Sequence, residues 1–247
     1  MKAKTRDDFL MSPTVDYCFK ELLAYPEIRK GFVAAILNQD PEKIAETTLM
    51  PTILGKDTEN GKYGILDVRI KMKSGTQMDL EMQVAPFEFW NKFHEDRTCF
   101  REIAFCDLTT KQKYTDLLEI YVLELKKLPP EQKEEPLIIK WMRFLAAESR
   151  EDFEKMAGED NYINEAYEVL QKLSADKRKR LEYEARQKAI RDYDSQMSSS
   201  REEGIRIGED RLNHLYEKLM RDHRSDDLVK AISDKVYREK LYQEYGL

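Results

Sequence analysis

The side chains best suited to chemistry lie in two neighbouring segments that alternate between polar and apolar residues. In residues 66–72 and 78–84 every even-numbered position is apolar, while the odd-numbered positions are polar and include Asp67, Glu81 and Gln83. A period of two is typical of a β-strand that buries one face. Two carboxylates and an amide on the other face offer hard oxygen ligands, which suit a divalent cation such as Mg²⁺, with Mn²⁺ as the alternative.

The turn between these segments fixes how the two strands are aligned. Lys73, Ser74 and Gly75 form a turn signal. Directly opposed residues of an antiparallel pair share a face, so both apolar sets reach one core only if even-numbered residues oppose even-numbered residues. A three-residue loop that ends on glycine in the left-handed conformation meets this condition. It predicts that Met72 pairs with Thr76.

This alignment has a chemical consequence. It opposes Arg69 with Asp79 and Asp67 with Glu81. Two opposed carboxylates are destabilising unless a cation lies between them or one is protonated, so a shared divalent ion is expected. A slip of two residues would oppose Arg69 with Glu81 and Lys71 with Asp79 instead, giving an ordinary salt-bridged face. The sequence leaves both alignments open.

The sequence on both sides of this hairpin predicts the helices and strands that position it. Ser12 and Pro13 predict the cap and first residue of an N-terminal helix, and Pro26 separates it from a second one. Residues 47–54 look extended, with Pro51 at an edge or break. The segment LEIYVLEL at 118–125 predicts a further strand.

Helical patterns dominate the rest of the chain. Helices are expected over residues 137–149 and from Tyr162 to about Ser195, and the segment SSSREEG at 198–204 predicts a hinge before a last helical stretch. We therefore expect an α/β (α+β) protein with a long helical C-terminal half. Its predicted divisions are a core at 1–130, a helical region at 131–197, and a hinge with a C-terminal helical segment at 198–247.

Composition limits the partners and the compartment. The formal net charge of −6 gives no general attraction to a polyanion, so nucleic acid would need local basic patches such as residues 177–191. That stretch also fits a solvated helix face, because acidic residues interrupt it. Three cysteines without a CxxC pair favour a reducing compartment, and no run is long and apolar enough to span a bilayer. We expect a cytoplasmic protein without a membrane partner.

Four segments together resemble a known family. They are SPTVDYCFKELLA, ILDVRIKMKSGTQMDLEMQ, LEIYVLELKKLP and EEGIRIGE. In these segments the chain resembles the PD-(D/E)XK nuclease family transposases, also called recombination-promoting nucleases. The resemblance implies a restriction-endonuclease-like mixed-sheet core, magnesium dependence, and DNA cleavage linked to recombination or transposition.

The resemblance also implies roles for individual residues. Asp67 and Glu81 would be metal ligands, the main-chain carbonyl of Met82 would add a third, and Gln83 would stand at the usual lysine position. The first helix, with Asp16, would border the site, although an ion pair between Asp16 and Lys20 explains these charges equally well. The chain departs from the family at residues 85–117, which are shorter than the corresponding segment of its members.

Three functions follow from these observations. The first is a magnesium-dependent DNA endonuclease. The second is a catalytically weak or inactive relative that acts as a DNA-binding or oligomeric interaction protein, with a homo-oligomer left open. The third is a helical scaffold with an incidental acidic hairpin. The alignment of the hairpin separates the third from the others, because a metal site requires the carboxylates of Asp67 and Glu81 to converge.

Overall fold

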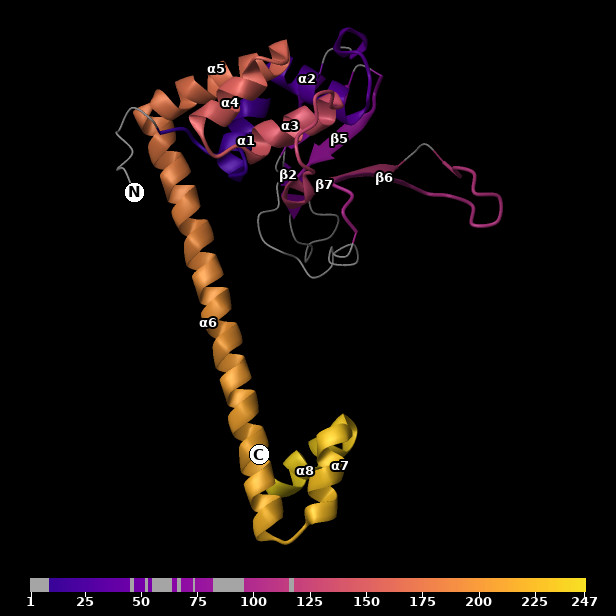
Figure 1. Ribbon diagram of the computed structural model, residues 1–247, viewed down its shortest axis with the longest axis vertical. Coiled ribbons are helices and arrows are strands. Elements are labelled where there is room, and N and C mark those ends of the chain that lie inside the picture. The colour runs from indigo at the N-terminus through magenta and orange to yellow at the C-terminus, as the bar shows by residue number, and fades with distance from the viewer. Residues whose placement is uncertain are drawn as a thin grey trace. The chain divides into compact units, whose positions relative to one another are not determined.

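The structure is a computed structural model, and it describes residues 9–44, 47–51, 53–54, 64–65, 68–72, 74–81, 96–115 and 118–247 (Figure 1). Contacts divide the chain into two compact units, Met1–Gln187 and Lys188–Leu247. Each unit is described by itself. The three predicted domains at 1–130, 131–197 and 198–247 stay predictions.

Two helices open the first unit, α1 (Asp16–Leu23) and α2 (Pro26–Ile36). Pro26 is the first residue of α2, as predicted. The prediction for α1 is wrong at its start, because Pro13 lies in a turn and Val15 is the N-cap. The hydroxyl of Ser12 bonds to that of Thr14 at 2.7 Å, so Ser12 does not cap the helix.

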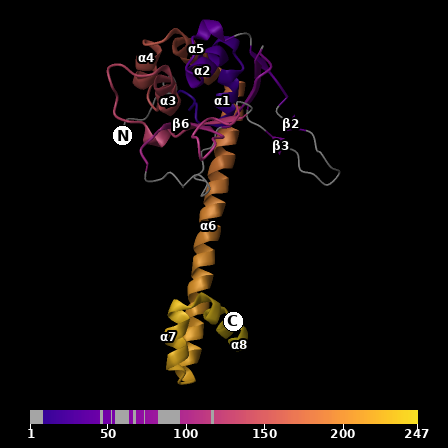
Figure 2. The same cartoon turned by 90° about the vertical axis from the view of Figure 1, so that its right-hand side faces the viewer.

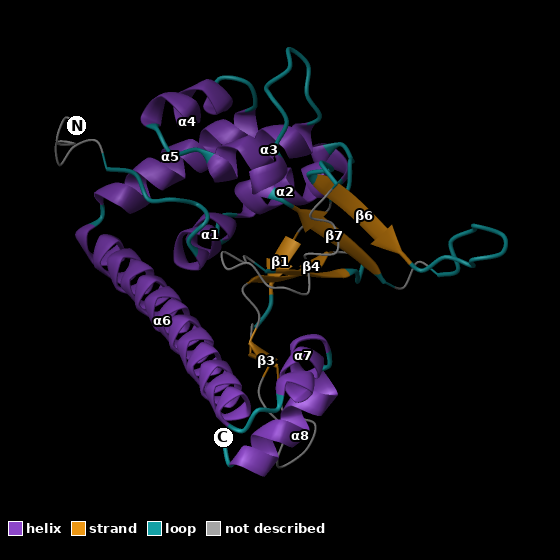
Figure 3. Ribbon diagram, turned by 60° about the horizontal axis from the view of Figure 1, so that its bottom comes forward, coloured by secondary structure: helices purple, strands orange, loops and turns teal. Residues whose placement is uncertain are grey.

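Three further helices, α3 (Leu137–Ala146), α4 (Arg150–Ala157) and α5 (Asn161–Ala175), complete the helical layer of this unit (Figure 3). The helix predicted over 137–149 is confirmed by α3. The core consists of buried aliphatic and aromatic side chains from these helices and includes Phe19, Phe32, Trp141, Phe144, Phe153, Ile163 and Leu170. Neighbouring rings in this core meet edge to face, such as Phe32 with Trp141 at 5.4 Å between centroids.

The described strands form small antiparallel sheets. The largest has the order β1-β4-β5, and two-stranded sheets join β2 to β3 and β6 to β7. Their bounds are β1 Thr47–Leu49, β2 Ile53–Leu54, β3 Gly64–Ile65, β4 Val68–Met72, β5 Gln77–Leu80, β6 Phe100–Ala104 and β7 Glu119–Leu123. Pro51 lies between β1 and β2, and β7 confirms the strand predicted at 118–125. The α+β class with a helical C-terminal half is confirmed.

The longest helix, α6 (Lys177–Arg221), corrects two predictions. A single helix over 162–195 is wrong, because Asp176 separates α5 from α6 and accepts hydrogen bonds from the amides of Arg178 and Lys179. The break in structure expected at 198–204 is also wrong, since α6 runs through it. This stretch has no proline, and Glu203 and Asp210 each form an ion pair with Arg206 inside the helix.

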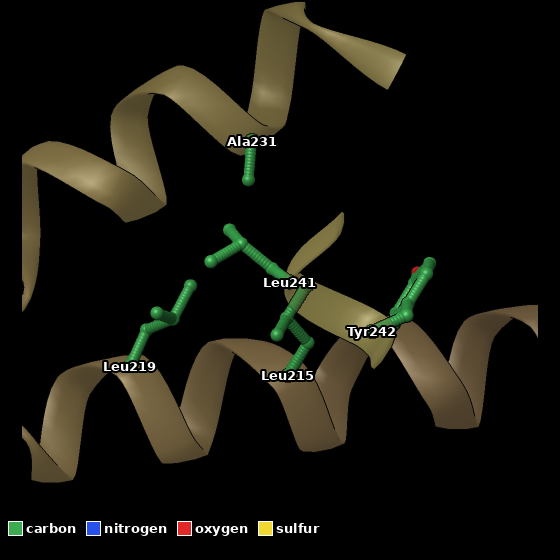
Figure 4. Packing of buried hydrophobic residues seen from close by; sticks show 5 residues of the cluster. All are labelled: Leu215, Leu219, Ala231, Leu241 and Tyr242. Atoms are coloured by element: carbon green, nitrogen blue, oxygen red, sulfur yellow. The ribbon is translucent and has the colours of Figure 1, made fainter. Parts of the chain in front are cut away.

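The second unit closes on the C-terminal end of α6. Two short helices, α7 (Ser225–Ser233) and α8 (Lys235–Tyr245), follow the turn after Arg221 (Figure 2). They pack a small apolar cluster that consists of Leu215, Leu219, Ala231, Leu241 and Tyr242 (Figure 4). Within the described part of the chain, no helix combines the length and the apolar character needed to cross a membrane.

Candidate active site

The turn of the β4–β5 hairpin has the predicted geometry. The amide of Met72 donates to the carbonyl of Thr76 at 2.8 Å, and the amide of Gly75 donates to the carbonyl of Met72 at 2.9 Å. Gly75 has a φ of +92°, a conformation that costs glycine little and other residues more. A loop that ends on Gly75 is therefore confirmed.

The alignment of the two strands is also the predicted one. Arg69 opposes Asp79, and Val68 opposes Leu80. The Nε of Arg69 lies 3.5 Å from an Oδ1 oxygen of Asp79, and its Nη2 donates to Gln77 at 2.6 Å. The alternative with a slip of two residues, which would oppose Arg69 with Glu81, is wrong.

The hairpin separates its two sets of side chains onto two faces. Val68 and Ile70 are 3% and 0% exposed, so the even-numbered side chains of β4 belong to the core. Lys71, Asp79 and Glu81 are exposed. A slip of one residue would expose the buried set to water, so the alternation in the sequence excludes odd slips. The observed pairs decide between the predicted alignment and a slip of two residues.

The structure describes one of the four predicted site residues. Glu81 directly follows β5 and is exposed. Asp67, Met82 and Gln83 lie outside the described residues. Among the residues that the structure does describe, no three acidic, histidine or cysteine side chains gather closely enough to hold a metal ion. Whether the predicted ligands converge therefore stays a prediction.

The acidic side chains of α1 have basic partners on α6. Arg186 donates from Nε to both carboxylate oxygens of Asp16 at 2.8 Å, whereas Lys20 lies 3.9 Å from one of them. Lys179 forms an ion pair with one carboxylate oxygen of Glu21. The ion pair between Asp16 and Lys20 is confirmed, but Arg186 is the closer partner, and the sequence analysis missed it. The signal was available in part, because Lys179 and Arg186 are seven residues apart and therefore share one helix face.

Two further arginines of the basic stretch at 177–191 also have partners nearby. Arg178 and Arg180 pair with Glu182 and Glu184 one turn further along α6. The guanidinium of Arg180 in addition lies 3.9 Å from the centroid of the Phe9 ring. These contacts fit a surface that is held together by its own charges better than one prepared for phosphate groups.

A shallow hollow of about 340 Å³ lies between α1 and the start of α6. Its lining combines acidic and basic side chains with one phenol and consists of Tyr17, Glu21, Asp176, Arg178, Lys179 and Glu182. Burial, together with the nearby carboxylates, raises the pKa of Tyr17 above its ordinary range. No residue of the β4–β5 hairpin lines this hollow, so it contributes nothing to the predicted metal site.

Comparison with known proteins gives one match. The family model described as PD-(D/E)XK nuclease family transposase matches residues 13–100 and 89–200. The two matched segments overlap at 89–100, inside the segment that the sequence analysis found to be short. No curated protein and no solved structure matches the chain.

Proposed function

Because this chain belongs to the PD-(D/E)XK nuclease family transposases, we propose that it is a divalent-metal-dependent DNA endonuclease that acts in recombination or transposition. Its metal ligands would be Asp67, Glu81 and the main-chain carbonyl of Met82, with Gln83 beside them. The proposed ion is Mg²⁺, with Mn²⁺ as the alternative. The three free cysteines are consistent with a cytoplasmic location.

The alignment of β4 with β5 is the observation that supports this function best. Val68 opposes Leu80, so a ladder that continues by one pair opposes position 67 with position 81. Both positions belong to the polar set of the alternating pattern, and Glu81 is exposed. Two carboxylates facing each other repel, and a divalent cation with oxygen ligands removes that repulsion.

The donor groups fit a hard divalent cation. Carboxylate and carbonyl oxygens suit Mg²⁺ and Mn²⁺, whereas thiolates and imidazoles are missing from the proposed set. Asp79, two pairs further along the hairpin, is engaged by Arg69 and would not compete for the ion. When bound, such an ion supplies Lewis-acid stabilisation of the phosphate and activation of the attacking water.

Gln83 limits how much the protein's own side chains can stabilise charge on the phosphate. Its amide can donate a hydrogen bond to a phosphate oxygen, but it carries no positive charge, so charge that develops there must be balanced by another group. Lys71 is a poor candidate, because it opposes Gln77, which lies four positions before Glu81, about 13 Å along the chain. Arg69 is nearer, but it is engaged with Asp79 and Gln77. We therefore expect slow cleavage that depends strongly on the metal.

Nicking of supercoiled plasmid tests the proposal. The wild type should cut with Mg²⁺ or Mn²⁺. Asp67→Ala and Glu81→Gln should each lower the rate by about 100-fold or more, because even the loss of a group that only supports a metal ligand costs about 10- to 100-fold. Asp79→Asn is the matched control, because it removes a carboxylate from the same face without touching the proposed ligands. A folded wild type that cuts with neither ion would overturn the proposal, as would full activity in Asp67→Ala.

A second candidate function is supported by the form of the family match. The family pattern is matched in two overlapping segments instead of one continuous stretch, and the overlap lies at 89–100. A core shortened at this point could retain DNA binding or self-association without cleavage. Binding of a labelled DNA duplex by a wild type that does not cut would favour this candidate.

A further inference from the structure

The middle of α6 is exposed to solvent on all its faces. Every residue from 191 to 210 is exposed, over a length of about 30 Å. This stretch contains three serines at 198–200 and two glycines, Gly204 and Gly208, which are poor helix formers. Because most helical stability in proteins comes from the packing of an apolar face, packing against another surface would stabilise this stretch.

The exposed stretch carries an apolar stripe. Tyr193, Met197 and Ile207 are 58%, 54% and 55% exposed, and Ile190 is partly buried at the start of the stripe. Together with Ser200 and Gly204, these positions are separated by alternating steps of three and four residues. That spacing places all six along one seam of a helix, as in a two-stranded coiled coil.

We propose that two copies of this chain pair antiparallel through residues 190–207 of α6. The pair has two-fold symmetry about a point between residues 198 and 199. Two seam residues that face each other across the pair therefore have residue numbers that sum to 397. The pairing therefore consists of three kinds of layer: Ile190 with the partner's Ile207, Tyr193 with the partner's Gly204, and Met197 with the partner's Ser200.

Complementary sizes favour the antiparallel direction. Open space surrounds Gly204, and a ring from another chain can occupy it. In the antiparallel pair the large side chain of Tyr193 meets this small residue. A parallel pair would instead place Tyr193 against the partner's Tyr193 and Gly204 against the partner's Gly204, which crowds one layer and leaves a void in another.

The charged residues beside the seam also favour the antiparallel direction, independently of side-chain size. Asp194 and Arg201 flank the seam on the same side. In the antiparallel pair Asp194 faces the partner's Arg201, and two-fold symmetry repeats this ion pair at the other end. In a parallel pair the positions that flank the seam bring Asp194 to an alanine and Arg201 to a glutamine. The second copy is thus an occupant that matches the stripe in both size and charge.

Charge reversal in the full-length chain tests the pairing. Sedimentation velocity should show a dimer at micromolar concentrations. Asp194→Arg and Arg201→Asp should each weaken association about tenfold, because each places like charges together twice. The double variant should restore association. A wild type that stays monomeric, or a double variant that associates no better than the singles, would overturn the proposal.

Disulfide trapping tests the direction. In a background with Cys99→Ser and Cys106→Ser, chains with Tyr193→Cys and chains with Gly204→Cys should cross-link to each other but not to themselves. Self-linking of Tyr193→Cys chains would show a parallel pair and overturn the antiparallel arrangement. Neither experiment uses DNA cleavage as its readout, so the result is independent of the proposed nuclease activity.

Discussion

Arg186 binds Asp16 through both carboxylate oxygens, at 2.8 Å from Nε, although the two residues are 170 positions apart in the chain. Burial by itself would raise the pKa of Asp16, but the hydrogen bond and charge of Arg186 outweigh it, so the pKa lies below its ordinary value. The carboxylate of Asp16 is therefore ionised and already satisfied. It serves to join α1 to α6 and is a poor candidate for a metal ligand.

The effect of this pair on stability should depend on pH. A folded-state pKa below the unfolded value means that the pair stabilises the protein above about pH 3.9, and that this contribution is lost as the pH falls through the folded-state pKa. We expect Arg186→Gln to lower the free energy of unfolding by about 1 kcal/mol at pH 7, since half of the arginine is exposed to solvent, and by less near pH 3.

Urea unfolding followed by circular dichroism at the two pH values measures this difference. Arg178→Gln is the control, because Arg178 is 89% exposed and pairs within its own helix. It should change stability little at either pH. An equal loss for Arg186→Gln at pH 7 and pH 3 would contradict the role assigned to the charge of Asp16.

Gly31 of α2 lies close against Tyr162 of α5. A Cβ atom at this position would lie 2.5 Å from the Cβ of Tyr162, which cannot move without its backbone. We expect Gly31→Ala to lower the free energy of unfolding by about 1–3 kcal/mol, the usual cost of an overpacked contact. Gly208→Ala is the matched control and should be neutral or stabilising by about 0.5 kcal/mol, since it lies in open space on a helix. Thermal unfolding of both variants tests this prediction. An unchanged melting temperature for Gly31→Ala would contradict the proposed overpacking against Tyr162.

Arg29 is a buried cation whose partners are main-chain carbonyls. Its Nη1 donates to the carbonyls of Leu23 and Ala24 at 2.8 Å, and its Nη2 donates to that of Thr47 at 3.1 Å. The side chain thereby joins the end of α1 to β1, the strand that pairs with β4. We expect Arg29→Met to cost about 3 kcal/mol, because it leaves several buried carbonyls without donors.

Arg29→Lys provides the matched comparison. One ammonium group cannot reach carbonyls on two sides as the planar guanidinium does, so lysine should recover only part of the stability. Urea unfolding of the two variants at neutral pH measures the difference. Wild-type stability in Arg29→Lys would show that charge alone, and not the shape of the guanidinium, is what this position requires.

Local patterns predicted the hairpin, while long-range pairs escaped prediction. The alternation that buries Val68 and Ile70 excluded every odd slip between β4 and β5, and the turn signal at 73–75 pointed to the alignment that is observed. The partner of Asp16 could not be inferred in the same way, since nothing near Asp16 in sequence indicates a residue 170 positions away. The hinge at 198–204 was wrong for a related reason. Serine and glycine lower helix propensity, but without a proline they do not end a helix.

The small cluster on α6, α7 and α8 should set the stability of the second unit. Leu219 is fully buried there, together with four other buried residues. The core of this unit is therefore small, and the loss of one side chain removes a large part of it. We expect Leu219→Ala to cost about 3 kcal/mol, from lost burial and the cavity that remains. Because contacts divide the chain at Gln187 and Lys188, this loss should be local to the second unit.

Hydrogen exchange followed by mass spectrometry can locate the effect. Amides of α7 and α8 should exchange faster in Leu219→Ala, while those of α3 and α5 keep their wild-type rates. Met220→Ala is the matched control, because the neighbouring side chain is 68% exposed and its truncation removes little buried surface. Equal acceleration in α3 and α5 would mean that the two units unfold together, and the second unit would then have no independent stability.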